Sequence, residues 1–148
     1  MRSHSILIGV LLGVSACSAA VTSDTAADVE TMRARWTARR AYSYDYVFDQ
    51  GGFFNACPRP VRAYVHANGV DSARVLATGQ LVSNNLVPCV PTIDGLFEAA
   101  VAAARSGKLT SIQYDATQGY PSEIVISGPP DASGWLRASS LANVLVAP

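Results

Sequence analysis

The sequence predicts an α+β domain in which an antiparallel β-sheet of about six strands carries two helices on one face. Apolar and polar residues alternate in several short segments, with the period of two that is typical of half-buried strands. Asn68-Gly69 and the turn at residues 115–119 separate such segments as hairpin turns do. Two longer segments repeat their apolar residues at the helical period instead, so we expect the order α-β-β-β-α-β-β-β.

The chain of 148 residues has the length of a single domain. We divide it into a signal peptide of lipoprotein type at residues 1–16, a flexible tether at residues 17–25 and one α+β domain at residues 26–148. The 11 basic residues balance the 11 acidic ones, and Arg33–Arg40 is the one segment where basic residues gather. We therefore expect no nucleic-acid partner.

The N-terminal segment carries the clearest functional signal. Arg2 precedes the apolar stretch Ile6–Val14, which is too short for the ~20 residues that span a bilayer and is typical of an export signal. Val14-Ser15-Ala16-Cys17 then resembles the lipobox of bacterial lipoproteins, with Cys17 as the lipidated residue. Ordinary secretion, with cleavage near residues 19–20, is the alternative.

Lipidation at Cys17 would attach the protein to a membrane. Each acyl CH₂ group buried in the bilayer contributes ~0.8 kcal/mol, and stable attachment requires more than one chain. Ser18–Thr25 is small and polar, as a tether should be. We expect an exported protein of the cell envelope, lipid-anchored to a membrane that faces the periplasm or the cell exterior. Ser18, in place of aspartate, favours the outer membrane where the cell has one.

The remaining cysteines also point to export. Cys57 and Cys89 form an even pair once Cys17 is lipidated, and such a pair in an exported protein predicts a disulfide. A disulfide that closes a loop of about 33 residues stabilises a domain by roughly 3–4 kcal/mol. Two buried thiols or a reactive cysteine are the alternatives. No Cys-x-x-Cys or paired-histidine spacing accompanies them, so we expect no metal and no cofactor.

The helices are predicted from their apolar stripes and caps. Asp24–Ala41 places Val29, Met32 and Trp36 on one face, with Asp24 or Thr25 as the N-cap. Thr92–Ser106 carries a continuous apolar face behind a Thr92 cap. The strands are predicted at Tyr42–Asp49, Val61–Ala67, Val70–Leu76, Leu109–Ala116, Pro121–Ser127 and Trp135–Val146. Asn68-Gly69 predicts a type I′ turn with positive φ at both positions.

Aromatic residues supply the candidate binding sites. Four of them share one face of the first predicted strand: Tyr42, Tyr44, Tyr46 and Phe48. This face is either the core side of the sheet, covered by a helix, or an exposed platform for a small ligand or glycan. Phe53 and Phe54 lie in a loop rich in Gly and Pro. They either pack over the sheet edge or form an exposed apolar contact site.

The hairpin at residues 111–127 has a structural and a functional interpretation. In the structural one, Tyr114 is packed, Asp115 holds the turn and Tyr120 lies at the rim. In the functional one, the same three residues form a binding cluster. The first is favoured because turn residues of this type are common.

Catalytic motifs are missing from the sequence. His66 is the one histidine after the signal segment, and Asp71 lies across the predicted hairpin from it. A solvated strand histidine is the favoured interpretation, since neither a Gly-x-Ser-x-Gly elbow nor a phosphate-binding loop occurs. We therefore predict that the protein is not an enzyme.

Several short motifs together resemble a known family. They are Trp36 and Arg40 before Tyr42-Ser-Tyr44, Asn68-Gly69-Val70, Pro91-Thr-Ile-Asp-Gly-Leu-Phe97, Gln113-Tyr-Asp115 and Gly119-Tyr-Pro121. Over about Val29–Ile126 the chain resembles the small secreted bacterial proteins labelled domain of unknown function 6174. The resemblance implies an exported envelope protein. It carries over no catalytic residue, because the family has no assigned activity.

Three functions remain open at this point. The first is a lipid-anchored envelope protein that binds another protein or assists assembly without catalysis. The second is a module that binds a small ligand or glycan on the aromatic sheet face. The third is a hydrolase, which would require His66, an acid and a hydroxyl to meet in one pocket.

We predict that the exported chain is acylated at Cys17. Mass analysis of the purified protein should find an N-terminal Cys17 carrying added acyl mass. The Cys17→Ser variant should lose both the acyl mass and membrane association, because two or more chains supply the attachment. A free N-terminus without acyl mass on the wild-type protein would contradict lipidation.

Overall fold

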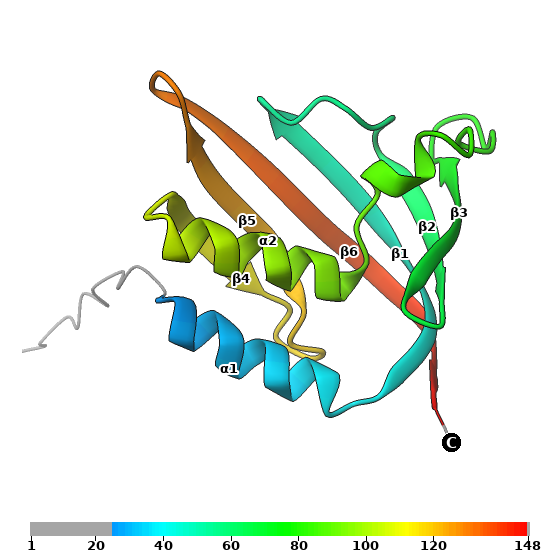
Figure 1. Ribbon diagram of the computed structural model, residues 1–148. Coiled ribbons are helices and arrows are strands. Elements are labelled where there is room, and N and C mark those ends of the chain that lie inside the picture. Colours follow the sequence, from blue (N-terminus) through cyan, green and yellow to red (C-terminus); the bar gives the residue numbers. More distant parts are fainter. Residues whose placement is uncertain (1–24, 148) are drawn as a thin grey trace, which may run out of the picture.

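Between residues 25 and 147, which the computed structural model describes, six antiparallel strands form one sheet and two helices pack on one of its faces (Figure 1). The predicted α+β class and the order α-β-β-β-α-β-β-β are confirmed. The predicted signal peptide at residues 1–16, the lipidation residue Cys17 and the tether up to residue 24 lie outside the described residues.

The first and last strands of the described chain pair at the centre of the sheet. The strand order is β3-β2-β1-β6-β5-β4, and every neighbouring pair is antiparallel. The helices are α1 (Ala26–Thr37) and α2 (Ile93–Arg105), and a short 3-10 helix, η1 (Val87–Cys89), precedes α2. The strands are β1 (Ala41–Gly52), β2 (Val61–His66), β3 (Gly69–Val75), β4 (Leu109–Tyr114), β5 (Pro121–Gly128) and β6 (Ala132–Val146).

Helix α1 begins at a capping box. Thr25 Oγ1 accepts a hydrogen bond from the Asp28 N–H at 3.3 Å, and the Asp28 carboxylate accepts one from the Thr25 N–H at 2.9 Å. Of the two predicted N-cap residues, Asp24 and Thr25, it is therefore Thr25 that caps the helix. The helix ends at Thr37, earlier than the predicted Ala41, because Arg40 takes a φ of 53° and turns the chain into β1.

Two tyrosines of β1 hold the start of α2. The Ile93 N–H donates to the Tyr44 hydroxyl at 3.0 Å, and the Tyr46 hydroxyl donates to the Pro91 carbonyl. Thr92, between these contacts, is the N-cap, as predicted. Burial raises the pKa of Tyr44 to about 12 and raises the pKa of Tyr46 well above its usual value. Both hydroxyls therefore stay protonated at neutral pH.

The aromatic face of β1 is the core side of the sheet. Tyr44, Tyr46 and Phe48 are buried, and Trp36 of α1 meets Tyr44 edge-on with ring centroids 5.8 Å apart. Tyr42, at the start of the strand, is exposed. The interpretation as a core face is confirmed for the three buried rings. The alternative, that these rings form an exposed platform for a ligand, is wrong.

The β2–β3 turn lies one residue earlier than predicted. Positive φ values occur at Ala67 (48°) and Asn68 (66°), whereas Gly69 is already the first residue of β3. The observed register pairs Ala63 with a buried alanine of β3. A turn at Asn68-Gly69 would place Ala63 opposite Arg74 and turn a guanidinium towards the core, which is costly without a partner.

The β4–β5 hairpin is held by its aspartate. Asp115 Oδ1 accepts the N–H groups of Thr117 at 3.0 Å and Gln118 at 2.7 Å, so the structural interpretation of this residue is confirmed. The rim position predicted for Tyr120 is wrong. Its ring is buried and packs edge-on against Trp36, with centroids 6.5 Å apart, because α1 covers this end of the hairpin.

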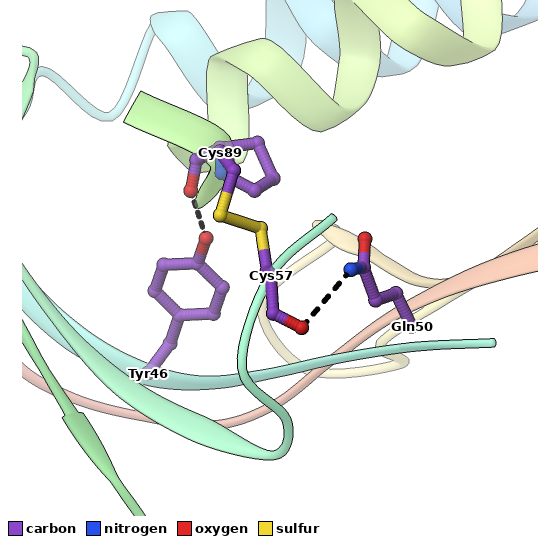
Figure 2. Close-up of a disulfide and its surroundings, with 5 residues drawn as sticks. Tyr46, Gln50, Cys57 and Cys89 are labelled. Carbon is purple, nitrogen blue, oxygen red and sulfur yellow. Dashed lines mark hydrogen bonds between the residues drawn. A yellow bond between two sulfur atoms is a disulfide. The ribbon is translucent and has the colours of Figure 1, made fainter. Parts of the chain in front are cut away.

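The predicted disulfide joins the loop after β1 to η1 (Figure 2). The Cα atoms of Cys57 and Cys89 are 5.6 Å apart. The Gln50 side-chain amide donates to the Cys57 carbonyl at 3.5 Å. The Tyr46 hydroxyl, which donates to the Pro91 carbonyl, lies beside the disulfide. The bond therefore fastens the β1–β2 loop to the segment that leads into α2.

We predict that this disulfide stabilises the fold. Reduction, or the Cys57→Ser substitution, should lower the free energy of unfolding by about 3–4 kcal/mol, as expected for a loop of about 33 residues. Urea unfolding measures the loss. Reduced wild type and Cys57→Ser should unfold at the same urea concentration, because both lack the same cross-link. Equal midpoints for the oxidised and reduced wild type would contradict the prediction.

Candidate functional site

The face of the sheet that the helices leave open carries a hollow of about 270 Å³. Asp45 and Tyr64 lie opposite each other in the β1–β2 ladder. Both alternate with core residues along their strands, so their side chains point away from the helices. The polar and aromatic side chains that line the hollow come from β1, β2, β3 and β6: Ser43, Asp45, Tyr64, His66, Asp71 and Asn143.

Asp45 is a buried charge on this face. Its residue exposure is 5%, and its carboxylate accepts hydrogen bonds from Arg62 Nη1 at 2.5 Å and from the side-chain amide of Asn143. Removing a carboxylate from water costs several kcal/mol unless it is paired and hydrogen-bonded. The two donors therefore compensate for the desolvation of Asp45.

Strand β6 is distorted where it passes Asp45. The β1–β6 ladder shifts register three times between residues 41 and 47 of β1. Ser140 and Asn143 each take a φ of 53°, which non-glycine residues rarely adopt. Bulges change the direction in which a strand presents its side chains, and this one brings the Asn143 amide onto the carboxylate.

The hollow also brings together the residues considered for hydrolysis. His66 and Asp71 both line it, as does Ser43. His66 is exposed, and its ring contacts Tyr42 edge-on with centroids 4.6 Å apart. Within residues 25–147 no hydrogen bond joins His66 to Asp71 or to Ser43. The base–nucleophile contact typical of a hydrolase is therefore not formed here.

Exposed apolar side chains gather at the end of the sheet next to this hollow. We call Tyr42, Val144, Leu145 and Val146 the apolar strand end. All four lie at the same end of the sheet because the last residues of β6 pair with the first residues of β1. All four are exposed, with Leu145 and Val146 each at 64%. Sequence reasoning missed this surface, because three consecutive apolar residues in a strand suggest burial.

Phe53 and Phe54 pack against the β5–β6 hairpin, and not over an edge strand of the sheet as one of the two interpretations had it. Their ring centroids are 4.4 Å apart, and the rings lie against Gly128 and Gly134. A Cβ atom at Gly128 would lie 2.7 Å from the Phe53 ring, so these glycines make room for the aromatic pair. Phe54 is half-buried, whereas Phe53 remains exposed. The pair covers the end of the sheet where β5 turns into β6, and it presents one ring to solvent.

A second hollow, of about 330 Å³, lies between α1 and the β4–β5 turn. Arg35 and Arg39 line it from the helix, and Asp115 lines it from the turn. Arg39 donates to the Thr117 carbonyl at 3.1 Å. This hydrogen bond and the packing of Tyr120 against Trp36 therefore fasten the turn to α1.

Residues 25–147 contain no group of three or more His, Cys, Asp and Glu side chains that could hold a metal ion. The sulfur atoms of Cys57 and Cys89 are bonded to each other. Neither helix in this part of the chain is long and apolar enough to cross a bilayer.

Comparison with known proteins identifies one family. The model of a family described as "Family of unknown function (DUF6174)" matches residues 28–134, which is more than half of the chain. No curated protein and no solved structure matches the chain significantly. The matched region includes Asp45, Tyr64 and Asp71 of the hollow. Asn143 and most of the apolar strand end follow it in the sequence.

We predict that Asp45 and Arg62 are energetically coupled. Arg62→Met leaves the buried carboxylate without its cation and should lower the free energy of unfolding by about 3 kcal/mol, the low end of the range for buried pairs, because Arg62 is partly exposed. Adding Asp45→Asn should restore at least about 1 kcal/mol, since no unpaired charge remains.

Urea unfolding of the single and double variants measures this coupling. Arg74→Met is the control, because this exposed arginine lies opposite Arg62 in the β2–β3 ladder and pairs with no acid in the described chain. Strictly additive losses for Asp45→Asn and Arg62→Met would contradict the coupling.

Proposed function

Because the chain belongs to the family of unknown function DUF6174, whose description names no activity, we propose a function from its own residues. The protein is an exported, lipid-anchored bacterial cell-envelope protein. It binds another envelope protein or assists assembly, and it catalyses no reaction. Export, anchoring and binding each have separate support.

The Cys57–Cys89 disulfide supports export. Disulfides form and persist in secreted and periplasmic proteins and are rare in the reducing cytosol. The export-type segment at residues 1–16 is consistent with this compartment. The two features are independent, because one lies in the leader and the other in the folded domain.

Lipidation at Cys17 would restrict where the domain can bind. The residues between Cys17 and α1 reach at most roughly 30 Å when fully extended. The domain then stays close to the membrane surface that holds its anchor. A partner on the same membrane, or in the layer beside it, meets the domain at high effective concentration.

The apolar strand end carries the proposal for protein binding. The core face of β1 is buried, so the aromatic side chains predicted as a platform are not accessible to a ligand. Leu145 and Val146 are among the most exposed large apolar residues of the described chain, and exposed apolar patches mark interaction sites. Aliphatic side chains on a strand end suit a protein partner, which can bury them and desolvate the surface.

The proposal that the protein catalyses no reaction rests on the contacts of the titratable side chains in the hollow. His66 contacts an aromatic ring, and no hydrogen bond to Asp71 or Ser43 prepares it as a base within residues 25–147. Asp45, the buried acid, is already bound by Arg62 and Asn143. This arrangement suits a binding surface better than a reacting one.

We predict that a photo-crosslinking residue at position 145 captures a defined envelope protein in intact cells. The control position is Leu81, which is 61% exposed, close to the 64% of Leu145. It lies at the end of the β2–β3 hairpin that is far from the apolar strand end. Position 81 should not capture the protein found at position 145. Mass spectrometry identifies the captured protein.

A charge at the same position provides the second measurement. Leu145→Lys should weaken the purified complex at least about ten-fold, because burying an unpaired ammonium is unfavourable, whereas Leu81→Lys should leave its affinity unchanged. Capture of the same proteins from both positions, or equal affinity of both lysine variants, would contradict this binding surface.

A further inference from the structure

The hollow on the open face contains features that protein binding at the apolar strand end does not use. A buried carboxylate, Asp45, is held by two donors in the middle of a sheet face that faces solvent. The backbone of β6 takes left-handed conformations at Ser140 and Asn143 to bring one of these donors into place. Strained backbone and buried charges often occur together at binding sites.

Several side chains in the hollow have unused hydrogen-bonding capacity. Within the described residues, the Asp71 carboxylate and the Ser43 hydroxyl make no side-chain hydrogen bond, and the His66 ring packs against Tyr42. Tyr64 presents its ring beside them, with 37% of the residue exposed. Acceptors, donors and an aromatic surface therefore face the same volume.

The charge and size of the hollow limit what it can bind. Asp45 and Arg62 neutralise each other, and Asp71 adds a negative charge, so an anion is disfavoured. An apolar ligand would remove water from these polar groups without replacing its hydrogen bonds. The volume of about 270 Å³ is just below the range typical of sites for drug-sized ligands and suits a unit of about one ring.

We propose that this hollow binds a neutral saccharide unit. Each sugar hydroxyl donates and accepts hydrogen bonds, and the hollow supplies matching groups: Asp71 accepts, Asn143 donates, and His66 does both. The apolar C–H face of the sugar ring lies on the exposed ring of Tyr64. The side chains of Asp45 and Tyr64 lie on the opposite face of the sheet from the buried Tyr46 and Phe48, and the site requires no protein partner.

The test is a titration of the full mature chain with Cys17→Ser, which removes the proposed acylation site and leaves the domain unchanged. The probes are the linear tetramers of N-acetylglucosamine and of glucose, both neutral, followed by amide chemical shifts. At least one tetramer should produce saturable shifts at millimolar concentration or below. The shifts should be confined to residues near the hollow: Ser43, Asp45, Tyr64, His66, Asp71 and Asn143.

Variants separate the aromatic contact from the polar contacts. Tyr64→Ala should weaken binding at least about ten-fold, the effect typical of removing an aromatic anchor, whereas Tyr64→Phe should keep it within about two-fold. Asp71→Asn should weaken binding while the urea midpoint stays unchanged, since Asp71 is exposed. Phe53→Ala is the matched control, because Phe53 is 40% exposed and lies just after the end of β1 that is far from the hollow.

Three results would overturn the assignment. The first is that neither tetramer shifts any resonance at millimolar concentration. The second is that the shifts lie outside the hollow or persist unchanged in Tyr64→Ala. The third is that the cationic tetramer of glucosamine binds more tightly than the neutral acetylated tetramer, which would indicate a cation site at Asp71 instead.

Discussion

The pairing of β1 with β6 is the constraint on which the rest of the structure depends. It joins the first and last strands of the described chain at the centre of the sheet, with β2 and β3 on one side and β5 and β4 on the other. Bringing these two strands together closes a loop that contains most of the chain, so the pairing has a high cost in conformational entropy. The disulfide and the packing of the helices offset part of this cost.

The two faces of β1 have different tasks. On the covered face, the hydroxyl groups of Tyr44 and Tyr46 hold the start of α2 through hydrogen bonds to backbone groups, and the rings contribute buried apolar surface to the core. On the open face, Asp45 is held by Arg62 and Asn143 inside a polar hollow. The aromatic residues that one interpretation assigned to ligand binding therefore stabilise the fold, and the polar side chains accessible to a ligand lie on the open face.

The proposed binding surfaces lie together, because both result from the way β6 ends. The bulges that bring Asn143 onto Asp45 precede Val144–Val146, which still pair with β1 but have exposed side chains. Under the proposed function, a domain tethered to a membrane would present this end to a neighbouring protein while the hollow beside it takes a smaller group. The two surfaces are independent in chemistry, since one is aliphatic and the other is polar.

The sequence by itself determined the fold class, the order of the elements, the Thr92 cap and the Cys57–Cys89 pair. These features follow from patterns among residues close in sequence, or from the number of cysteines. Only the tertiary structure decided whether the aromatic face of β1 is buried, the register of the β2–β3 turn, the burial of Tyr120 and the composition of the hollow. Asp45 and Asn143 are 98 positions apart, and their contact depends on a bulged ladder that no local pattern encodes.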